Sequence, residues 1–400
     1  MTDIAIRTLA DDELREASRL FRESLHVLPV RDEDWPRARH AYQPDRTLGA
    51  HDDGALVGTA RSFDATMTVP GGRRVPMAAV TGVGVRADHT RRGVLTELMR
   101  AQLTDLAERE VPLAGLYASE APIYGRFGYG SAMAVRSLTV ARRRAVLRDG
   151  VPHGGTVELL RWADALEKLP GIYAGLDRSR AGLMSRPEHW WVGIDGQLRT
   201  ATAPVMVAVH SGPDGPDGFA VYSVSRPDGW ERAVLKVDDL HAGTDSAFAG
   251  LWRFLLRVDL VEEIELSERA LDEPVELLVT DTRAVRVTGT GDGLWLRLVD
   301  VPAALAARHR EGGSVTLEVL DPVLPANTGT YLVSADEVRR TDRPAQLRLD
   351  ADTLAMAYLG TWAPSTLAAT GRIEVLDPAA PAAADRLFAA QPDAWCGTFF

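Results

Sequence analysis

The sequence contains little cysteine or lysine and no long apolar run. Its single cysteine, Cys396, excludes an internal disulfide framework and any multi-cysteine zinc or iron–sulfur site. The nine histidines show no ligand spacing, so no metal is expected. No stretch approaches the ~20 apolar residues of a membrane span, and the first residues are acidic where a secretory signal is basic. We therefore expect a cytoplasmic protein with no metal and no membrane partner.

Positive charges are outnumbered by negative ones. The 45 Lys and Arg against 56 Asp and Glu give a net charge of −11, and only Lys168 and Lys236 are lysines. Non-specific affinity for nucleic acid comes mainly from clustered cations, so no nucleic-acid partner is expected. A cationic partner fits this charge better.

The length of 400 residues, at ~150 per domain, predicts two or three domains. Hydrophobic residues at 46% and charged residues at 25% are typical of globular chains. A Gly- and Pro-containing segment at 149–155 indicates one border. We predict domains at residues 1–150, 151–287 and 288–400, each of mixed α/β (α+β) structure.

The pattern of apolar residues predicts the main elements. In the first domain we expect a helix over 11–25, strands broken at turns 52–54 and 70–72, a helix after Arg92 and a strand near 112–118. The expected elements of the second domain are helices at 160–175 and 187–192, three strands between 205 and 240, and a helix over 247–256. Those of the third are strands at 294–298, 314–320 and 346–349, and helices at 302–308 and 353–359. The aromatic chain end, 395–400, is expected to be tucked in, because ordinary termini are polar and frayed.

The segment VTGVGVRADHTRRGVLTELMR, residues 80–100, is the strongest candidate for chemistry. It predicts a strand, a turn and a helix whose first backbone N–H groups are free to bind phosphate oxygens. Arg91 and Arg92 add cationic donors, and Gly93 allows a close backbone approach. The alternative is a solvated basic turn at the start of a helix.

This segment resembles motif A of the GNAT acetyltransferases, whose turn wraps the pyrophosphate of acetyl-CoA. Thr90 and Leu95 depart from the general pattern, but the departures are similar to those of the Eis (enhanced intracellular survival) N-acetyltransferases of actinobacteria. Three further blocks carry this resemblance: ASEAPIYGRFGYG at 118–130, DGLWLRLVDVPAAL at 292–305 and the aromatic C-terminus. The resemblance implies two GNAT-like domains, the second without cofactor, followed by a sterol-carrier-protein-like α/β domain.

The resemblance also implies which residues contact acetyl-CoA. The pantetheine would lie along Val83, Gly84 and Val85. The pyrophosphate would be wrapped by Arg91, Arg92, Gly93, Val94, Leu95 and Thr96. Ser119 and Glu120 would lie at the end of the second splayed strand.

Two residues match the catalytic groups of the family. Tyr124 matches the general acid, and the terminal carboxylate of Phe400 matches the proposed general base. A phenol with a pKa near ~10 is suited to protonating a thiolate whose thiol has a pKa near ~8.5. An α-carboxylate with a pKa near ~3.5 is a weak base, so it acts through water or mainly attracts the amine. Phe399 stands where the family often has an acid.

The resulting prediction is an acetyl-CoA-dependent N-acetyltransferase that acts on primary amines of polyamine or aminoglycoside type, or on lysine side chains. The alternative is a non-catalytic protein that binds CoA or lipid. The family resemblance implies a homohexamer.

Three other residue groups are weaker candidates for chemistry. No His lies near Cys396 in sequence, which disfavours it as a nucleophile. Trp35, beside three acids, either lines an amine pocket or belongs to a surface cluster at a helix start. Trp190 and Trp191 are expected in the core.

Overall fold

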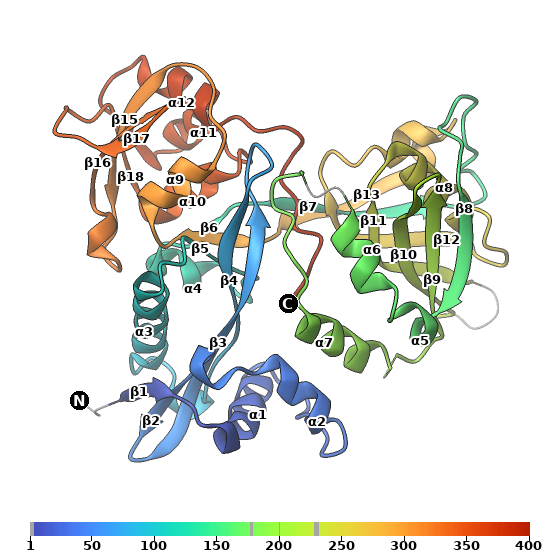
Figure 1. Cartoon of the computed structure of the whole chain (residues 1–400), viewed down its shortest axis with the longest axis horizontal. Coiled ribbons are helices and arrows are strands. Elements are labelled where there is room, and N and C mark those ends of the chain that lie inside the picture. Colours follow the sequence, from blue (N-terminus) through green and yellow to red (C-terminus); the bar gives the residue numbers. More distant parts are fainter. Residues whose placement is uncertain (1–3, 177–178, 200, 228–231) are drawn as a thin grey trace. The chain divides into compact units, whose positions relative to one another are not determined.

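The computed structural model describes residues 4–176, 179–199, 201–227 and 232–400, which form two compact units (Figure 1). The first unit contains the chain up to Met133, together with Leu294–Gln391 and Phe399–Phe400. The second contains Ala134–Gly293 and Pro392–Thr398. Each unit is therefore assembled from segments that are distant in sequence.

The first unit contains a seven-stranded sheet in the order β1-β2-β3-β4-β5-β14-β6. Its strands are β1 (Ala5–Thr8), β2 (Thr47–Asp52), β3 (Ala55–Thr68), β4 (Arg74–Val85), β5 (Leu113–Leu116), β14 (Trp295–Leu298) and β6 (Gly130–Ser131). The pairs from β1 to β4 are antiparallel, and β4 and β5 run parallel. The helices of this part are α1 (Leu14–Ser24), α2 (Trp35–Ala38), α3 (Val94–Glu108) and α4 (Ala121–Tyr124).

Helices α1 and α3 cover opposite faces of this sheet. A Cβ atom at Gly84 of β4 would lie 3.1 Å from Cα of Phe21 in α1. The neighbouring residue Val83 packs instead with Val94 and Leu98 of α3. Successive side chains of a strand point to opposite faces, so the two helices sandwich β4.

A second sheet of the first unit has the order β17-β16-β15-β18-β19. Its strands are β15 (Ser314–Leu320), β16 (Gly329–Ser334), β17 (Val338–Arg340), β18 (Leu347–Asp350) and β19 (Ile373–Val375). The helices around it are α9 (Val301–Ala307), α10 (Ala351–Tyr358), α11 (Pro364–Ala369) and α12 (Ala380–Phe388).

The second unit has one seven-stranded sheet in the order β13-β7-β12-β11-β10-β9-β8. Its strands are β7 (Ala134–Ala141), β8 (Thr156–Arg161), β9 (Val205–Gly212), β10 (Gly215–Ser225), β11 (Val234–Ala242), β12 (Glu263–Ala270) and β13 (Val285–Asp292). Its helices are α5 (Trp162–Ala165), α6 (Leu169–Gly175), α7 (Glu188–Leu198) and α8 (Asp245–Leu255). As in the first unit, one parallel pair, β11 and β12, is joined through a helix.

The structure confirms the predicted helices and strands in most places. The predicted meander corresponds to β2, β3 and β4, and the predicted helix after Arg92 corresponds to α3. Trp190 and Trp191 are buried as expected. The chain end is tucked in only in part, because Trp395 and Thr398 are buried while the Phe399 side chain is 61% exposed.

The strand predicted at 294–298 lies in a different place from the one expected. We expected this strand in the third domain, but β14 lies between β5 and β6 of the first sheet. Its residues Leu296, Arg297 and Leu298 are buried, as in a strand covered on both faces. The domain borders at 150 and 287 remain predictions. Strand β7 lies upstream of residue 150 and pairs with β12 and β13 of the second unit.

Candidate active site

A bulge in β4 opens the first sheet beside β5. The pairing of β3 with β4 shifts register between Thr59 and Arg61, where Gly82 adopts a left-handed φ of +62°. Strands β4 and β5 pair only from Met77 to Ala79 on the β4 side. Beyond Ala79 the two parallel strands no longer bond, so the peptide groups of 80–85 that face β5 are left for another partner.

The turn after β4 is fixed by its own side chains. Asp88 accepts hydrogen bonds from Arg86 at 2.6 Å, and His89 lies 2.8 Å from Asp88 and 3.2 Å from Asp52. The bond from Arg86, followed by that from His89, lowers the pKa of Asp88 to about 2. The carboxylate of Asp88 is thereby engaged within the turn.

The helix that follows begins without a side-chain cap. Gly93, at φ +90°, is the N-cap of α3, and Arg91 also adopts a positive φ of 62°. The first intrahelical bond runs from the Glu97 N–H to the Gly93 carbonyl at 3.1 Å, so the preceding N–H groups have no partner within the helix. Arg91 and Arg92 are exposed, and neither takes part in an ion pair within the described ranges. Backbone donors and two cations thus converge at one helix end.

The second arm of the opening runs from β5 into α4 and carries Tyr124. This side chain is 6% exposed and its hydroxyl is hydrogen-bonded to Ser119. Burial raises the pKa of Tyr124 above its ordinary value, and the bond from Ser119 opposes that shift. The ring packs edge-on against Tyr129 with centroids 6.1 Å apart. Ser119, predicted as a cofactor contact, therefore also contacts the predicted acid, while Glu120 is exposed beside it.

The glycines after Tyr124 have a packing role that sequence reasoning missed. Gly128 has a φ of +82°, and a Cβ there would lie 2.8 Å from the Arg297 guanidinium. A Cβ at Gly130 would lie 2.1 Å from the backbone oxygen of Asp352 in α10. These glycines let β14 and the C-terminal helices pack closely behind the tyrosine.

The last two residues pack against aromatic side chains of the same unit. The Phe399 ring lies 4.7 Å from that of Tyr117, and the Phe400 ring lies 5.4 Å from Tyr117 and 5.5 Å from Phe63. Tyr117 follows β5 directly, two residues before Ser119. The chain end and the predicted acid are thus brought to the same arm. Tyr117 and Phe63 were not predicted, and their aromatic character is the only signal in the sequence.

The other candidates lie in packed surroundings, and the choice between an amine pocket and a surface cluster for Trp35 stays open. Trp35 packs with Tyr42 at a centroid distance of 5.7 Å, beside a cluster of Leu9, Leu14 and Ala17. The buried thiol of Cys396 donates to the carbonyl of Thr398 at 3.3 Å. In the described parts of the chain, no group of three or more His, Cys, Asp and Glu is arranged to hold a metal ion. Over the same ranges, no helix combines the length and apolarity of a bilayer span.

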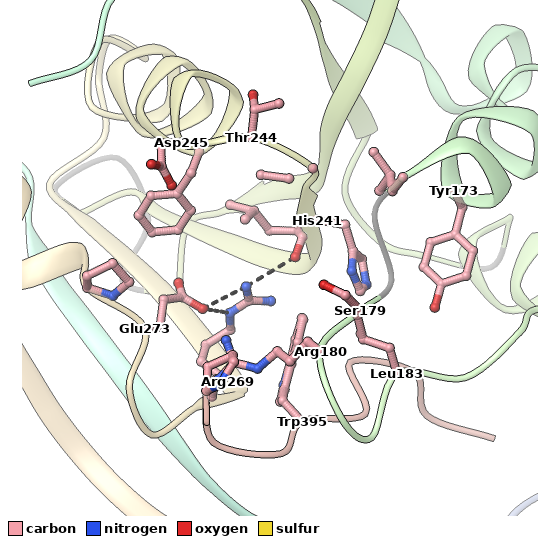
Figure 2. A pocket seen from close by; sticks show the side chains of 18 residues that line it. Tyr173, Ser179, Arg180, Leu183, His241, Thr244, Asp245, Arg269, Glu273 and Trp395 are labelled. Carbon is pink, nitrogen blue, oxygen red and sulfur yellow. Dashed lines mark hydrogen bonds and ion pairs between the residues drawn. The ribbon is translucent and has the colours of Figure 1, made fainter. Parts of the chain in front are cut away.

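The second unit repeats the open parallel pair but differs at its helix start. Strands β11 and β12 pair only from Val234 to Val237 on the β11 side. The α8 helix is capped by Thr244, which accepts from the Ala247 N–H at 3.0 Å, and Asp245 occupies its first turn. A cavity of about 390 Å³ lies at the end of β11 (Figure 2). In its wall Arg269 is paired with Glu273 at 2.7 Å. One N–H of this helix start is therefore capped by a side chain, and an acidic residue in the first turn disfavours an anion there.

Comparison with known proteins agrees with this reading of the two sheets. Residues 5–132 and 182–298 each match the acetyltransferase (GNAT) domain, and residues 301–397 match the sterol carrier protein domain. An uncharacterized N-acetyltransferase of Streptomyces avermitilis is 34% identical over 100% of this chain and 99% of its own. The N-acetyltransferase Eis of Mycobacterium tuberculosis is 36% identical over 82% of each chain. The crystal structure of Eis1 from Mycobacterium abscessus superposes with a TM-score of 0.91 at 39% identity and covers 100% of both chains.

Proposed function

Since the chain belongs to the Eis family of GNAT N-acetyltransferases, we propose that it acetylates a primary amine of a small cationic molecule, of polyamine or aminoglycoside type, at the expense of acetyl-CoA. The observation that carries the proposal is the buried phenol of Tyr124, bonded to Ser119 on the arm that also holds the aromatic chain end. The net charge of −11 favours a cationic acceptor. A lysine side chain of a protein is the alternative acceptor for the same chemistry.

The open edge of β4 and the start of α3 fit acetyl-CoA, which supplies the acetyl thioester when bound. The peptide groups of Val83, Gly84 and Val85 would hold the pantetheine, because β5 does not pair with them. The free N–H groups from Gly93 to Thr96 and the guanidinium groups of Arg91 and Arg92 would hold the pyrophosphate. Val94 and Leu95 contribute backbone donors, and Ser119 and Glu120 would border the other side.

Tyr124 would donate its phenolic proton to the departing thiolate. Burial raises the pKa of Tyr124, so the phenol stays protonated throughout the neutral range. The bond from Ser119 opposes the effect of burial and would stabilise the phenolate that remains after proton transfer.

The carboxylate of Phe400 would attract the ammonium group of the acceptor and take its proton. Three aromatic contacts hold the last two rings against Tyr117 and Phe63. A carboxylate at a chain end is a weak base, so a bridging water or a late proton transfer suits it best.

The direct test is Tyr124→Phe, assayed by thiol release from acetyl-CoA with a panel of amines. We expect turnover to fall about 100-fold or more with unchanged acetyl-CoA affinity, as for a lost general acid. The matched control is Tyr129→Phe. Its hydroxyl is buried without a hydrogen-bond partner in the described structure, so its removal should leave turnover intact. Normal turnover of Tyr124→Phe would assign the proton donor to another group.

Deletion of Phe399 and Phe400 tests the chain end. Because Phe399 is 61% exposed and Phe400 is half-buried, deleting both rings should cost about 2 kcal/mol of stability. We expect amine acetylation to be abolished while acetyl-CoA still binds. A truncated chain that acetylates amines at the full rate would exclude a catalytic carboxylate.

We further propose, on the family resemblance, that the chain forms a homohexamer and works in the cytoplasm. Light scattering that gives the mass of six chains would support the assembly. The mass of a single chain at micromolar concentration would contradict it.

A further inference from the structure

A buried cation in the second unit holds the segment that precedes the chain end. The Arg186 side chain is 1% exposed. Its guanidinium donates to Asp239 at 2.6 Å, to the hydroxyl of Thr398 at 2.9 Å and to the carbonyl of Gly397 at 2.7 Å. Two of these three partners belong to the C-terminal tail, defined here as Pro392–Thr398.

Aromatic rings surround the same guanidinium. It lies 4.2 Å from the ring centres of Tyr173 and Trp190 and 5.4 Å from that of Trp191. Burying a guanidinium is costly unless its donors are satisfied, and here Asp239 supplies the opposite charge. The arrangement therefore fixes one geometry for the tail rather than allowing several.

The tail borders the opening between β11 and β12. The Trp395 indole donates to the carbonyl of Glu268 in β12 at 2.7 Å, and its ring centre lies 5.1 Å from that of His241 in β11. Figure 2 shows Trp395 beside His241 and Arg269 in the wall of the cavity. Gly397, at φ +61°, has no room for a side chain, because a Cβ would lie 2.5 Å from the Trp395 ring.

This opening corresponds in topology to the acetyl-CoA opening of the first unit. Each lies beyond the last paired residues of a parallel strand pair that is connected through a helix, β4–α3–β5 in the first unit and β11–α8–β12 in the second. In the first unit the helix start is uncapped and flanked by arginines. In the second unit the helix start is capped by Thr244, and the tail lines the opening through Trp395.

We propose that the second GNAT-like domain uses its splayed strand pair to bind the chain's own C-terminal tail, and that Arg186 is the positioning residue that fixes Gly397 and Thr398 for acetyl transfer. This inference rests on the proposed role of the Phe400 carboxylate, which lies two residues beyond Thr398. Phe399 packs against Tyr117 with one face and is 61% exposed. A proton acceptor must stay within hydrogen-bond reach of its substrate, and the anchor immediately upstream limits how far the carboxylate can move.

The test is a double-mutant cycle on the full-length chain. One change is Arg186→Lys, since an ammonium cannot bridge Asp239, Gly397 and Thr398 together. The other is a single glycine appended after Phe400, which displaces the carboxylate. We expect Arg186→Lys to lower kcat at least tenfold with little change in acetyl-CoA affinity. In the chain with the appended glycine, Arg186→Lys should lower the remaining kcat less than twofold.

Arg136→Lys is the matched control. Arg136 is a largely buried arginine of the same unit, paired with Glu276 at 2.5 Å and bonded to no tail residue in the described structure. Arg136→Lys should lower the melting temperature to a similar extent as Arg186→Lys and leave kcat within about twofold of the wild-type value. Release of Phe400 by carboxypeptidase gives a readout of anchoring that does not depend on catalysis. That release should be faster in Arg186→Lys and unchanged in Arg136→Lys.

If Arg186→Lys does not fold, Thr398→Val removes one hydrogen bond of the anchor and takes its place in the cycle. Equal losses of kcat with and without the appended glycine would overturn the positioning role alone. An appended glycine that leaves kcat unchanged would overturn the proposed carboxylate chemistry, and the positioning role with it. Unchanged carboxypeptidase release in the folded variant would overturn the anchor itself.

Discussion

Replacing Asp321 with asparagine should destabilise the first unit more than any change to an exposed ion pair. Arg297 of β14 and Asp321 form an ion pair at 2.6 Å in which both side chains are 0% exposed. Asp321 also accepts from the amide of Asn327 at 2.9 Å and from the backbone N–H groups of Val323 at 3.2 Å and Leu324 at 3.0 Å. All of its acceptor capacity is therefore in use.

The size of the effect follows from what Asp321→Asn leaves behind. The variant removes the only negative charge recorded beside Arg297 in the described structure, so a buried guanidinium loses its counter-charge. The new NH₂ group must also face either two backbone N–H groups or Arg297 and Asn327, all of which are donors. Loss of one partner of a buried pair costs about 3–5 kcal/mol. With a slope of about 3 kcal/mol per M, the urea midpoint should fall by about 1 M or more.

The assay is urea unfolding followed by tryptophan fluorescence and circular dichroism together, because a chain of two units need not unfold in one step. Glu337→Gln is the control, since Glu337 and Arg339 pair at 3.2 Å with about half of each side chain exposed. That change should cost less than about 1 kcal/mol. A midpoint for Asp321→Asn that matches the control would refute the reasoning.

Three further predictions address binding, packing and pH. Arg92→Glu should weaken acetyl-CoA binding by at least about 1.5 kcal/mol in calorimetry, while Arg100→Glu, farther along α3, should change that affinity little. Unchanged binding of Arg92→Glu, or two sites per chain, would contradict the assigned turn. In a thermal melt, Gly130→Ala should lower stability by about 2 kcal/mol, because a Cβ there would lie 2.1 Å from a backbone oxygen. The control Gly125→Ala should be nearly neutral, because its Cβ would meet only a side-chain oxygen at 3.9 Å. Burial alone would raise the pKa of Asp239, but the charges of Arg186 and His241 outweigh burial and lower that pKa. The contribution of Asp239 to stability is therefore full above about pH 4 and is lost as the pH falls toward the pKa of Asp239 in the folded protein. Urea midpoints between pH 2.5 and 6, in steps of about half a unit, should therefore decline more steeply for the wild type than for Asp239→Asn, and parallel curves would exclude this linkage.

Local patterns were enough to predict the elements around the candidate site. Apolar spacing predicted α3, the turn residues predicted the meander, and the Arg91–Gly93 sequence predicted the open helix start. These features depend on neighbours within a few residues of one another. The fold family could be named for the same reason, because its motifs are short and contiguous.

Long-range partners could not be predicted in this way. The strand LWLRL is apolar enough to suit either sheet, and only the structure shows that it completes the first one. The partners of Arg186 at Gly397 and Thr398 are more than 200 positions away. The packing role of Gly128 and Gly130, which make room for Arg297 and α10, also depends on residues far away in sequence.

The insertion of β14 also affects how the chain matures on the ribosome. Until Trp295–Leu298 has been synthesised, one edge of β5 has no strand beside it, and β6 has no partner in the sheet at all. The gap from Met133 to Trp295 is about 160 residues, which at 5–20 residues per second leaves that edge open for roughly 8–30 s. An uncovered strand edge is a site for mispairing with other nascent chains. The first sheet can therefore close only after the whole middle of the protein has emerged, and fragments that stop near residue 150 should be prone to aggregate.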